Sequence, residues 1–251
     1  MFADAQELLN EIVEKKLLRA RGVYGFFPAV NEGDDVQLFT DESQAEPLLK
    51  LHFLRQQMVK SDGAPNRSLA DFIAPASAGL KDHLAAFAVT AGIGLKELVE
   101  HYKADHDDYN AIMAEAIADR LAEAFAEWLH ARVRREWGYG HDEGLTNEQM
   151  IAEEYRGIRP AAGYPACPDH TEKGLLWKLL DVEKSAGISI TESYAMWPGS
   201  SVSGLYFAHP QSRYFGLGKI ERDQVAEYAL RKGETVAYVE KWLSPNLNYE
   251  P

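Results

Sequence analysis

The segment from Asp108 to Arg135 constrains the fold more than any other part of the chain. Apolar residues recur along it at helical spacing, at positions 113, 117, 121, 124, 125 and 128, with alanines between them. A helix of about 28 residues spans about 42 Å at 1.5 Å per residue. The spacing therefore predicts one long central helix with a continuous apolar stripe.

Strands are expected before and after this helix, mostly in pairs. "GVYGFFPAV" has the pattern of a strand, and "NEGDDVQLFT" predicts a turn and a second strand, because Gly-Asp-Asp suits a hairpin connection. "HLAAFAVTAG" predicts a buried strand, and "VSGLYF" with "YFGLGKI" predicts another hairpin around "AHPQSR". Helical patterns separate these pairs, and two of them, "RDQVAEYALRKG" and "TVAYVEKWL", close the chain. The predicted fold class is α+β, with a largely antiparallel twisted sheet flanked by helices.

Two shorter segments are also informative. "LADFIAP" ends at Pro75 and predicts a strand end that brings Asp71 to the surface. Leu48–Met58 fits a helix or a strand, and both interpretations stay open.

Composition narrows the class of protein. The 251 residues carry a formal net charge of -13, which repels phosphate and argues against nucleic acid or an anionic membrane as a partner. A single cysteine forms no internal disulfide, the N-terminal residues are too charged for a signal peptide, and no apolar run approaches the roughly 20 residues that span a bilayer. We expect a cytoplasmic protein. GxGxxG, GxxxxGK[ST] and GxSxG signatures are absent from the sequence, and so is zinc-ligand spacing, so no metal site is predicted.

The stretch "RPAAGYPACPDHTEK", Arg159–Lys173, is the strongest candidate site. Its prolines restrict the backbone, and the arginine at its head suits bidentate capture of a carboxylate, although a surface salt bridge is an equal alternative. Cys167 with His170 three residues later is conceivable as a nucleophile, but a small buried hydrophobe fits better. Asp169 and Glu172 have the spacing of a capping box for a following helix.

Two acidic groups have competing interpretations. "HYKADHDDYN" contains carboxylates and histidines, but their spacing matches no ligand pattern and favours a solvated helix start over a metal site. Asp119 and Glu123 lie four residues apart on the long helix, hence on one face. They form either a solvated surface or a carboxylate pair that awaits a cation.

Many stretches resemble the activation domain of cobalamin-dependent methionine synthase. They include "RPAAGYPACPDHTEK", "TESYAMWPGSSVSGLYFAHPQSRYFGLGKIERDQVAEYA" and the tail "WLSPNLNY". "GVYGFFPAVNEGDDVQLFTDE", "LRQQ", "LADFIAP" and "DHDDYN" are similar to the same domain and follow in the same order. The resemblance covers nearly the whole chain from about residue 20.

The resemblance implies that residues 1–251 form a single S-adenosylmethionine-binding activation domain that lacks part of the family's N-terminal helical segment. In the family, this domain docks over oxidised cob(II)alamin and presents S-adenosylmethionine. One electron from flavodoxin or another reductase, together with the methyl group, restores methylcobalamin for methionine biosynthesis. The expected partner is a cobalamin-binding domain or subunit, and no turnover is expected from this chain alone.

The resemblance also implies a set of cofactor-binding residues, from the family's RxxxGY motif and two further segments. They are Arg159, Ala161, Gly163, Tyr164, Asp71, Tyr214 and Phe215. It places the carboxylate pair near the methyl end of the ligand on Asp119 and Glu123. The chemistry agrees, because Arg159 can pair with the carboxylate of the ligand and Asp71 with its ammonium group. Tyr214 can lie against the adenosine or the sulfonium.

The chain departs from the full enzyme in what it contains. It has no DxHxxG motif, and its one cysteine cannot supply a thiolate zinc site. We therefore expect an excised domain or one subunit of a split synthase. A non-catalytic S-adenosylmethionine-binding or docking module, which carries the same residues, remains the alternative, and a metal-dependent hydrolase built on "HYKADHDDYN" is a third.

Overall fold

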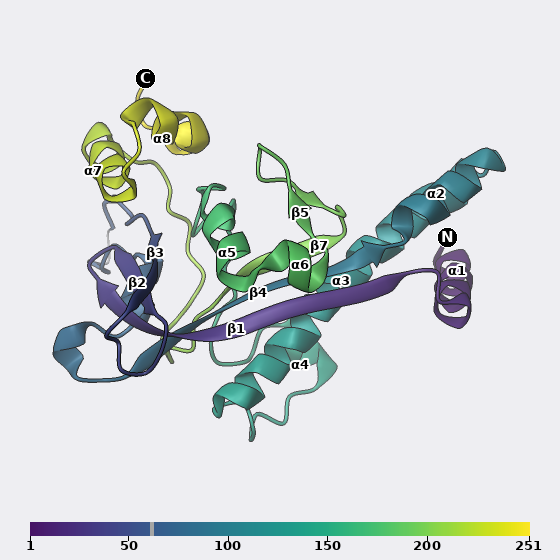
Figure 1. Ribbon diagram of the computed structural model, residues 1–251, viewed down its shortest axis with the longest axis horizontal. Helices are drawn as coiled ribbons and strands as arrows, with labels where there is room; N and C mark the ends of the chain where they lie inside the picture. Colours follow the sequence, from purple (N-terminus) through teal and green to yellow (C-terminus); the bar gives the residue numbers. More distant parts are fainter. Residues whose placement is uncertain (61–62) are drawn as a thin grey trace. The chain divides into compact units, whose positions relative to one another are not determined.

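The structure, a computed structural model, describes residues 1–60 and 63–251 (Figure 1). Its elements are α1 (Phe2–Lys15), β1 (Arg19–Glu32), β2 (Asp35–Phe39), β3 (Pro47–His52), the short 3-10 helices η1 (Leu69–Phe72) and η2 (Ala76–Ala78), β4 (Asp82–Ile93), α2 (Leu95–Ala104), α3 (Asp108–Trp137), α4 (Asn147–Ile151), α5 (Glu172–Leu180), α6 (Val182–Ala186), β5 (Ser189–Ile190), β6 (Met196–Trp197), β7 (Ser201–Tyr206), α7 (Arg222–Lys232), α8 (Val236–Leu243) and η3 (Ser244–Asn246).

The main sheet has the strand order β3-β2-β1-β4-β7, and β5 pairs with β6 separately. β2 is antiparallel to both of its neighbours, β1 and β3. Glu32 pairs with Asp35, so Gly33, with a φ of 78°, lies in the tight turn that the Gly-Asp-Asp pattern predicts. β3 settles the open choice for Leu48–Met58, because the first part of that segment is a strand. The predicted α+β class with an antiparallel sheet is confirmed.

The chain forms two compact units. Unit 1 contains residues 1–24, 87–152 and 180–203, and unit 2 contains residues 25–86, 153–179 and 204–251. No helix within the described ranges is long and apolar enough to cross a membrane.

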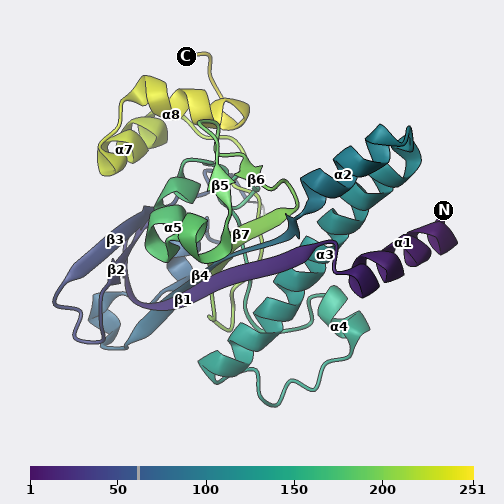
Figure 2. The same cartoon turned by 45° about the vertical axis from the view of Figure 1, so that its right-hand side comes forward.

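Unit 1 is built around α3. The predicted long helix is confirmed over 30 residues, from an N-cap at Asp107, whose side chain accepts a hydrogen bond from the Asn110 backbone, to Gly138 in the left-handed conformation. α2 folds back along the first part of α3 (Figure 2), and α1 packs on the same helix. Residues from all three helices form one core cluster: Leu8, Ile12, Leu98, Met113 and Ala114.

The buried face of α3 differs from the stripe of large apolar residues. Its buried residues are Ala111, Met113, Ala114, Ala118, Ala122, Ala126, Leu129, His130, Val133 and Arg134. Alanine dominates because a side chain that ends at Cβ lets the helix backbone pack closely against its neighbours. Of the predicted stripe, only Met113 belongs to this buried face, and it lines a groove beside α1 together with Ile117, Leu121 and Ala124.

Unit 2 has its own core, which joins α7 and α8 to irregular segments. Its members are Leu54, Leu217, Ile220, Val225, Tyr228, Ala229, Val239, Leu243 and Leu247. α7 ends at Gly233 in the left-handed conformation, as predicted.

Three local predictions in unit 2 are wrong. β7 forms, but residues 214–219 are not a strand, because Leu217 N donates to Pro165 O (2.8 Å) and Ile220 N to Asn246 O (2.9 Å). "LADFIAP" contains η1 instead of a strand end, capped by Ser68, although Asp71 does reach the surface. The third is wrong only in part: Asp169 Oδ1 does accept from the backbone N of Thr171 just before α5 (2.8 Å), but the Glu172 carboxylate accepts from the His52 backbone and from Lys232.

Candidate functional site

The proline loop, residues Arg159–Lys173, is closed by two backbone hydrogen bonds. Gly163 N donates to Cys167 O (2.7 Å), and Cys167 N donates to Tyr164 O (2.9 Å). Gly163 has a φ of 93°, and a Cβ at this position would lie 2.2 Å from Cε1 of His170. Only glycine fits here, because the imidazole occupies the space that a side chain needs.

Cys167 and His170 thus have structural roles in the loop. Cys167 is buried, and burial raises the pKa of its thiol far above the usual range. The thiol stays protonated at neutral pH, which favours the small buried hydrophobe over the nucleophile. Burial and the nearby Lys173 lower the pKa of His170, so a neutral ring packs on Gly163.

Arg159 lies on a short extended stretch that runs beside the end of β7. Ile158 and Phe207 exchange two backbone hydrogen bonds, and Leu205 N donates to Pro160 O (2.9 Å). Ile158 and Pro160 are buried, whereas Arg159 between them is only half-buried. Since side chains alternate along an extended backbone, the guanidinium is directed away from this buried side.

Two tyrosines hold Arg159. Its Nη1 donates to the hydroxyl of Tyr155 (2.9 Å), a side chain that is 8% exposed. Its backbone N donates to the hydroxyl of Tyr214 (3.0 Å), whose residue remains 43% exposed. Tyr214 and Tyr164, which is 62% exposed, both lie at the surface.

The segment that carries Tyr214 and Phe215 is fastened on two sides. Leu217 N donates to Pro165 O of the proline loop, and Gln56 Nε2 donates to Gly216 O (2.7 Å). The structure therefore brings Tyr214 and Phe215 to the proline loop despite about 50 intervening residues.

Asp71 occupies an exposed position at η1. Its carboxylate accepts two hydrogen bonds from Arg55, Nη1 to Oδ2 (2.7 Å) and Nη2 to Oδ1 (2.6 Å), and one from Ser68 N (2.9 Å). The neighbouring Phe72 packs edge-on against Phe207, with ring centroids 6.2 Å apart.

Because Phe207 pairs with Ile158, this contact brings Asp71 and Arg159 to the same part of unit 2. Each is one residue away from a member of the Phe72–Phe207–Ile158 group. These contacts thus connect the segments of an anion and a cation that are 88 residues apart in sequence.

A buried ionic cluster anchors the far end of the proline loop to α7. Lys232 Nζ donates to Asp169 Oδ2 (2.8 Å), Thr171 Oγ1 (2.8 Å) and Glu172 Oε1 (2.5 Å), and Tyr228 OH donates to Asp169 Oδ2 (2.9 Å). Burial acts to raise the pKa of Asp169. The positive charge and the hydrogen bond of Lys232 outweigh this effect, so the pKa of Asp169 is lowered overall. Burial raises the pKa of Glu172. The attachment of this end of the loop to α7 therefore depends on the positive charge of Lys232.

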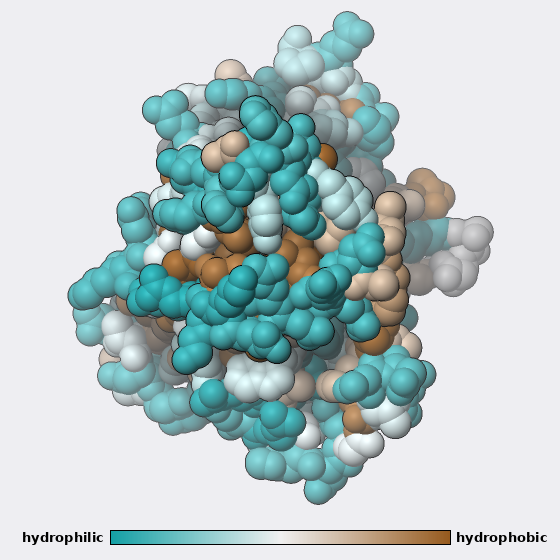
Figure 3. Space-filling model, turned by 90° about the vertical axis from the view of Figure 1, so that its right-hand side faces the viewer, coloured by the Kyte–Doolittle hydropathy of each residue, from teal (hydrophilic) through white to brown (hydrophobic). Residues whose placement is uncertain are grey.

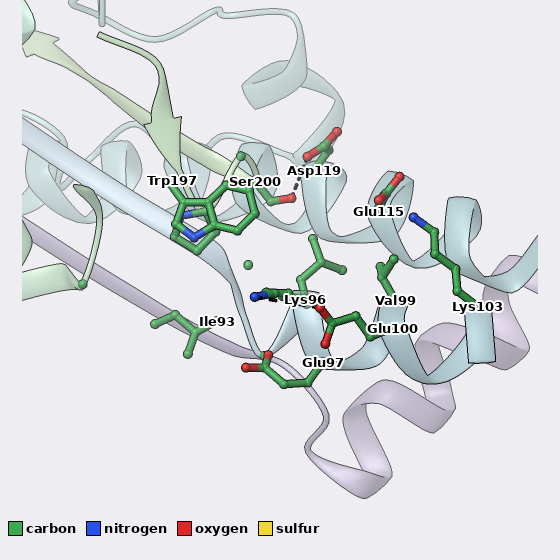
Figure 4. Close-up of a pocket in the computed structure, with 16 residues that line it drawn as sticks. Ile93, Lys96, Glu97, Val99, Glu100, Lys103, Glu115, Asp119, Trp197 and Ser200 are labelled. Atoms are coloured by element: carbon green, nitrogen blue, oxygen red, sulfur yellow. Dashed lines mark hydrogen bonds and ion pairs between the residues drawn. The ribbon is translucent and has the colours of Figure 1, made fainter. Parts of the chain in front are cut away.

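The predicted carboxylate pair belongs to unit 1, whereas the other predicted site residues belong to unit 2. Asp119 lines a pocket of about 620 Å³ together with residues of α2 and the 197–200 turn (Figure 4). Ser200 Oγ donates to Asp119 Oδ1 (2.7 Å), which fixes the carboxylate at the wall of the pocket. Glu123 is exposed one turn further along α3.

Unit 1 also has an apolar groove of about 610 Å³ between α1 and α3. Figure 3, which shows the side where α1 and the tip of the α2–α3 hairpin lie, displays a band of hydrophobic residues between hydrophilic ones. The acidic segment at this tip caps α3 through Asp107, and no cluster of three potential metal ligands occurs in the part of the chain that the structure describes.

Sequence reasoning missed three supporting residues: Tyr155, Arg55 and Lys232. Tyr155 contacts Arg159 from four residues earlier, Arg55 contacts Asp71 from 16 residues earlier, and Lys232 anchors the proline loop from α7. Only "LRQQ", which contains Arg55, carried a signal, and it came from the resemblance.

The fold and this surface define an α+β protein with a rigid loop, an arginine and an aspartate in the same part of unit 2, and exposed tyrosines. Residues 1–233 match the family described as "Vitamin B12 dependent methionine synthase, activation domain". A solved structure, "Crystal Structure of the MetH Reactivation Domain bound to AdoHcy", is 54% identical with a TM-score of 0.97, over 99% of this chain and 77% of that one. The chain belongs to the family of B12-dependent methionine synthase activation domains.

Proposed function

We propose that this chain binds S-adenosylmethionine and supplies its methyl group for the reductive reactivation of cob(II)alamin to methylcobalamin. The observation that carries the proposal is the grouping of Arg159, Asp71 and exposed tyrosines in unit 2, in a chain 54% identical to a domain bound to AdoHcy. The chain serves as a domain or subunit of a methionine synthase, and we propose that residues 1–251 act as a single functional domain.

The residues fit the chemistry of the ligand. The Arg159 guanidinium can pair with its carboxylate by charge-assisted hydrogen bonds. A carboxylate has about four acceptor positions, and Asp71 uses three of them for Arg55 and Ser68 N, so one on Oδ1 remains for the ligand ammonium.

The exposed rings can hold the adenosine and the sulfonium. Tyr164 and Tyr214 are exposed aromatic residues, and a cation–π contact of such a ring with the sulfonium contributes about 0.5–2 kcal/mol. Ala161, Gly163 and Phe215 complete the proposed surface. Ala161 and Gly163 are small enough to let the ligand approach the backbone closely, and Phe215 contributes an apolar ring.

We assign Asp119 and Glu123 the role of negative potential near the sulfonium and methyl group. Both are exposed and lie four residues apart on α3, and Ser200 fixes the first of them. Neither is assigned an acid or base role, because methyl transfer to cobalt needs alignment more than proton transfer.

The proposed partners follow from the family. A cobalamin-binding domain or subunit supplies the cobalt centre that accepts the methyl group, and flavodoxin or another reductase supplies one electron. The residues of this chain bind and orient the methyl donor. A cytoplasmic location is proposed because the single, buried cysteine requires no oxidising compartment.

The test is reductive methylation in a mixture of this chain, a cobalamin domain loaded with cob(II)alamin, a reductant and S-adenosylmethionine. The expected result is the absorption spectrum of methylcobalamin, formed with the native chain and lost when AdoHcy replaces the methyl donor. Ligand binding without any methylcobalamin supports the alternative, a non-catalytic binding or docking module. No ligand binding contradicts both.

A further inference from the structure

We infer that Tyr155 and Arg55 are positioning residues that orient the two charged side chains proposed to bind the amino-acid end of the ligand. Tyr155 orients Arg159, and Arg55 orients Asp71. The inference rests on the proposed function and deepens it, since it explains how the site distinguishes a zwitterionic ligand from one that lacks either charge.

The surrounding core restricts the side chain of Tyr155, independently of its contact with Arg159. Tyr155 is 8% exposed, and its hydroxyl accepts a hydrogen bond from Arg159 Nη1 at 2.9 Å. A long arginine side chain loses much rotamer freedom when it binds a ligand, so a contact that orders it beforehand lowers that cost.

The backbone of Arg159 is ordered as well. Its N donates to Tyr214 OH, and the flanking Ile158 and Pro160 are bonded to the end of β7. Backbone and guanidinium are thus both set, which leaves Arg159 little freedom to lose on binding.

Arg55 fixes Asp71 through both carboxylate oxygens, at 2.7 and 2.6 Å. Arg55 is in turn held by Asn66 O, which accepts from Nη1 at 2.8 Å, and by Asp34 Oδ1 at 2.6 Å from Nη2. Two bonds from a planar fork fix the plane of the Asp71 carboxylate. The acceptor position that remains on Oδ1 therefore has a set direction before the ligand arrives.

A cation and an anion that are both ordered in advance select a ligand with a carboxylate and an ammonium group at matching ends. The site is then expected to discriminate by charge pattern as well as by the adenosine. This discrimination depends on Tyr155 and Arg55 even though neither is proposed to touch the ligand.

The experiment crosses two variants with three ligands in calorimetric titrations of the full chain: AdoHcy, its decarboxylated analogue and its deaminated analogue. Tyr155→Phe is expected to weaken binding of AdoHcy and of the deaminated analogue about five- to tenfold, with a change below about twofold for the decarboxylated analogue. Arg55→Lys keeps the positive charge but loses the bidentate contact with the Asp71 carboxylate. It is expected to weaken the binding of AdoHcy and of the decarboxylated analogue, the two ligands that carry the ammonium group, and to leave the binding of the deaminated analogue unchanged.

Tyr249→Phe is the matched control. Tyr249 lies in the same unit and its hydroxyl donates to Glu240 Oε1 at 2.9 Å, so the variant loses one hydroxyl hydrogen bond away from the proposed site. We expect no change for any of the three ligands.

Equal losses for all three ligands, or no loss for AdoHcy, overturn the inference, because a merely structural role does not depend on the charge pattern of the ligand. A Tyr155→Phe chain that fails to fold overturns the role assigned to Tyr155, and Arg55 is then judged by its own variant. Failure of the unaltered chain to bind AdoHcy overturns the proposed function itself, and it is recognised without any variant.

Discussion

Replacing Lys232 by methionine probes the ionic cluster that anchors the proline loop. The Lys232 side chain is 8% exposed, and its partners Asp169 and Glu172 are 4% and 5% exposed. Methionine fills the space of the lysine stem but leaves two buried carboxylates without their cation. Removing one partner of a buried ion pair costs about 3–5 kcal/mol. We expect the free energy of unfolding at pH 7 to fall by about 3 kcal/mol or more.

The pH dependence of this defect has a defined sign. In the native chain the pKa of Asp169 is lowered, so this group stabilises the fold above its unfolded pKa and loses that contribution on acidification. In Lys232→Met the charge that opposed burial is gone, and we expect burial to outweigh the remaining hydrogen bonds from Thr171 and His52 and to raise the folded-state pKa of both carboxyls above their unfolded values. The folded variant then binds more protons, and its stability falls as pH rises above about 4. The defect is therefore smaller at pH 5 than at pH 7.

The assay is urea unfolding, followed by circular dichroism at both pH values. Lys241→Met on α8 is the control, because Lys241 is exposed and its loss is expected to cost less than about 0.5 kcal/mol. A loss below about 1 kcal/mol for Lys232→Met at pH 7, or a larger defect at pH 5, refutes the role given to the cluster.

Three further outcomes are expected. Gly163→Ala lowers the melting temperature more than Gly33→Ala and weakens AdoHcy binding at least about tenfold, since both glycines have positive φ but only at Gly163 does a Cβ meet His170; equal effects contradict the clash. Asp119→Asn keeps an oxygen that accepts from Ser200 Oγ but removes the charge, so calorimetry is expected to show about two- to fivefold weaker S-adenosylmethionine binding with unchanged affinity for the uncharged thioether of AdoHcy. Cys167 reacts with a thiol reagent only as fast as the chain unfolds, because its thiol is buried and its pKa is raised; rapid reaction in native buffer speaks against its burial.

Local sequence patterns predicted the elements that depend on neighbouring residues. α3 follows from helical spacing over 30 residues, the β1–β2 turn from Gly33, and the end of α7 from Gly233. Each signal is contained within a few turns of backbone, so distant contacts do not change the outcome.

Distant contacts explain the errors. The apolar pattern of 214–220 suits a strand, but its backbone groups bond to Pro165 and Asn246, which the pattern does not contain. Loop composition singled out Arg159, whereas Asp71 and Tyr214 needed the resemblance. Arg55 lies 16 residues from Asp71, and Lys232 lies 63 from Asp169, so neither contact has a local signature.

The central claim, that this chain binds S-adenosylmethionine through Arg159, is tested most directly by calorimetric titration of the ligand into the unaltered chain and into Arg159→Ala. We predict saturable binding to the unaltered chain and a loss of about 2 kcal/mol or more, roughly 30-fold in affinity, in the variant. No binding to the unaltered chain at millimolar ligand, or equal binding by both, contradicts the claim.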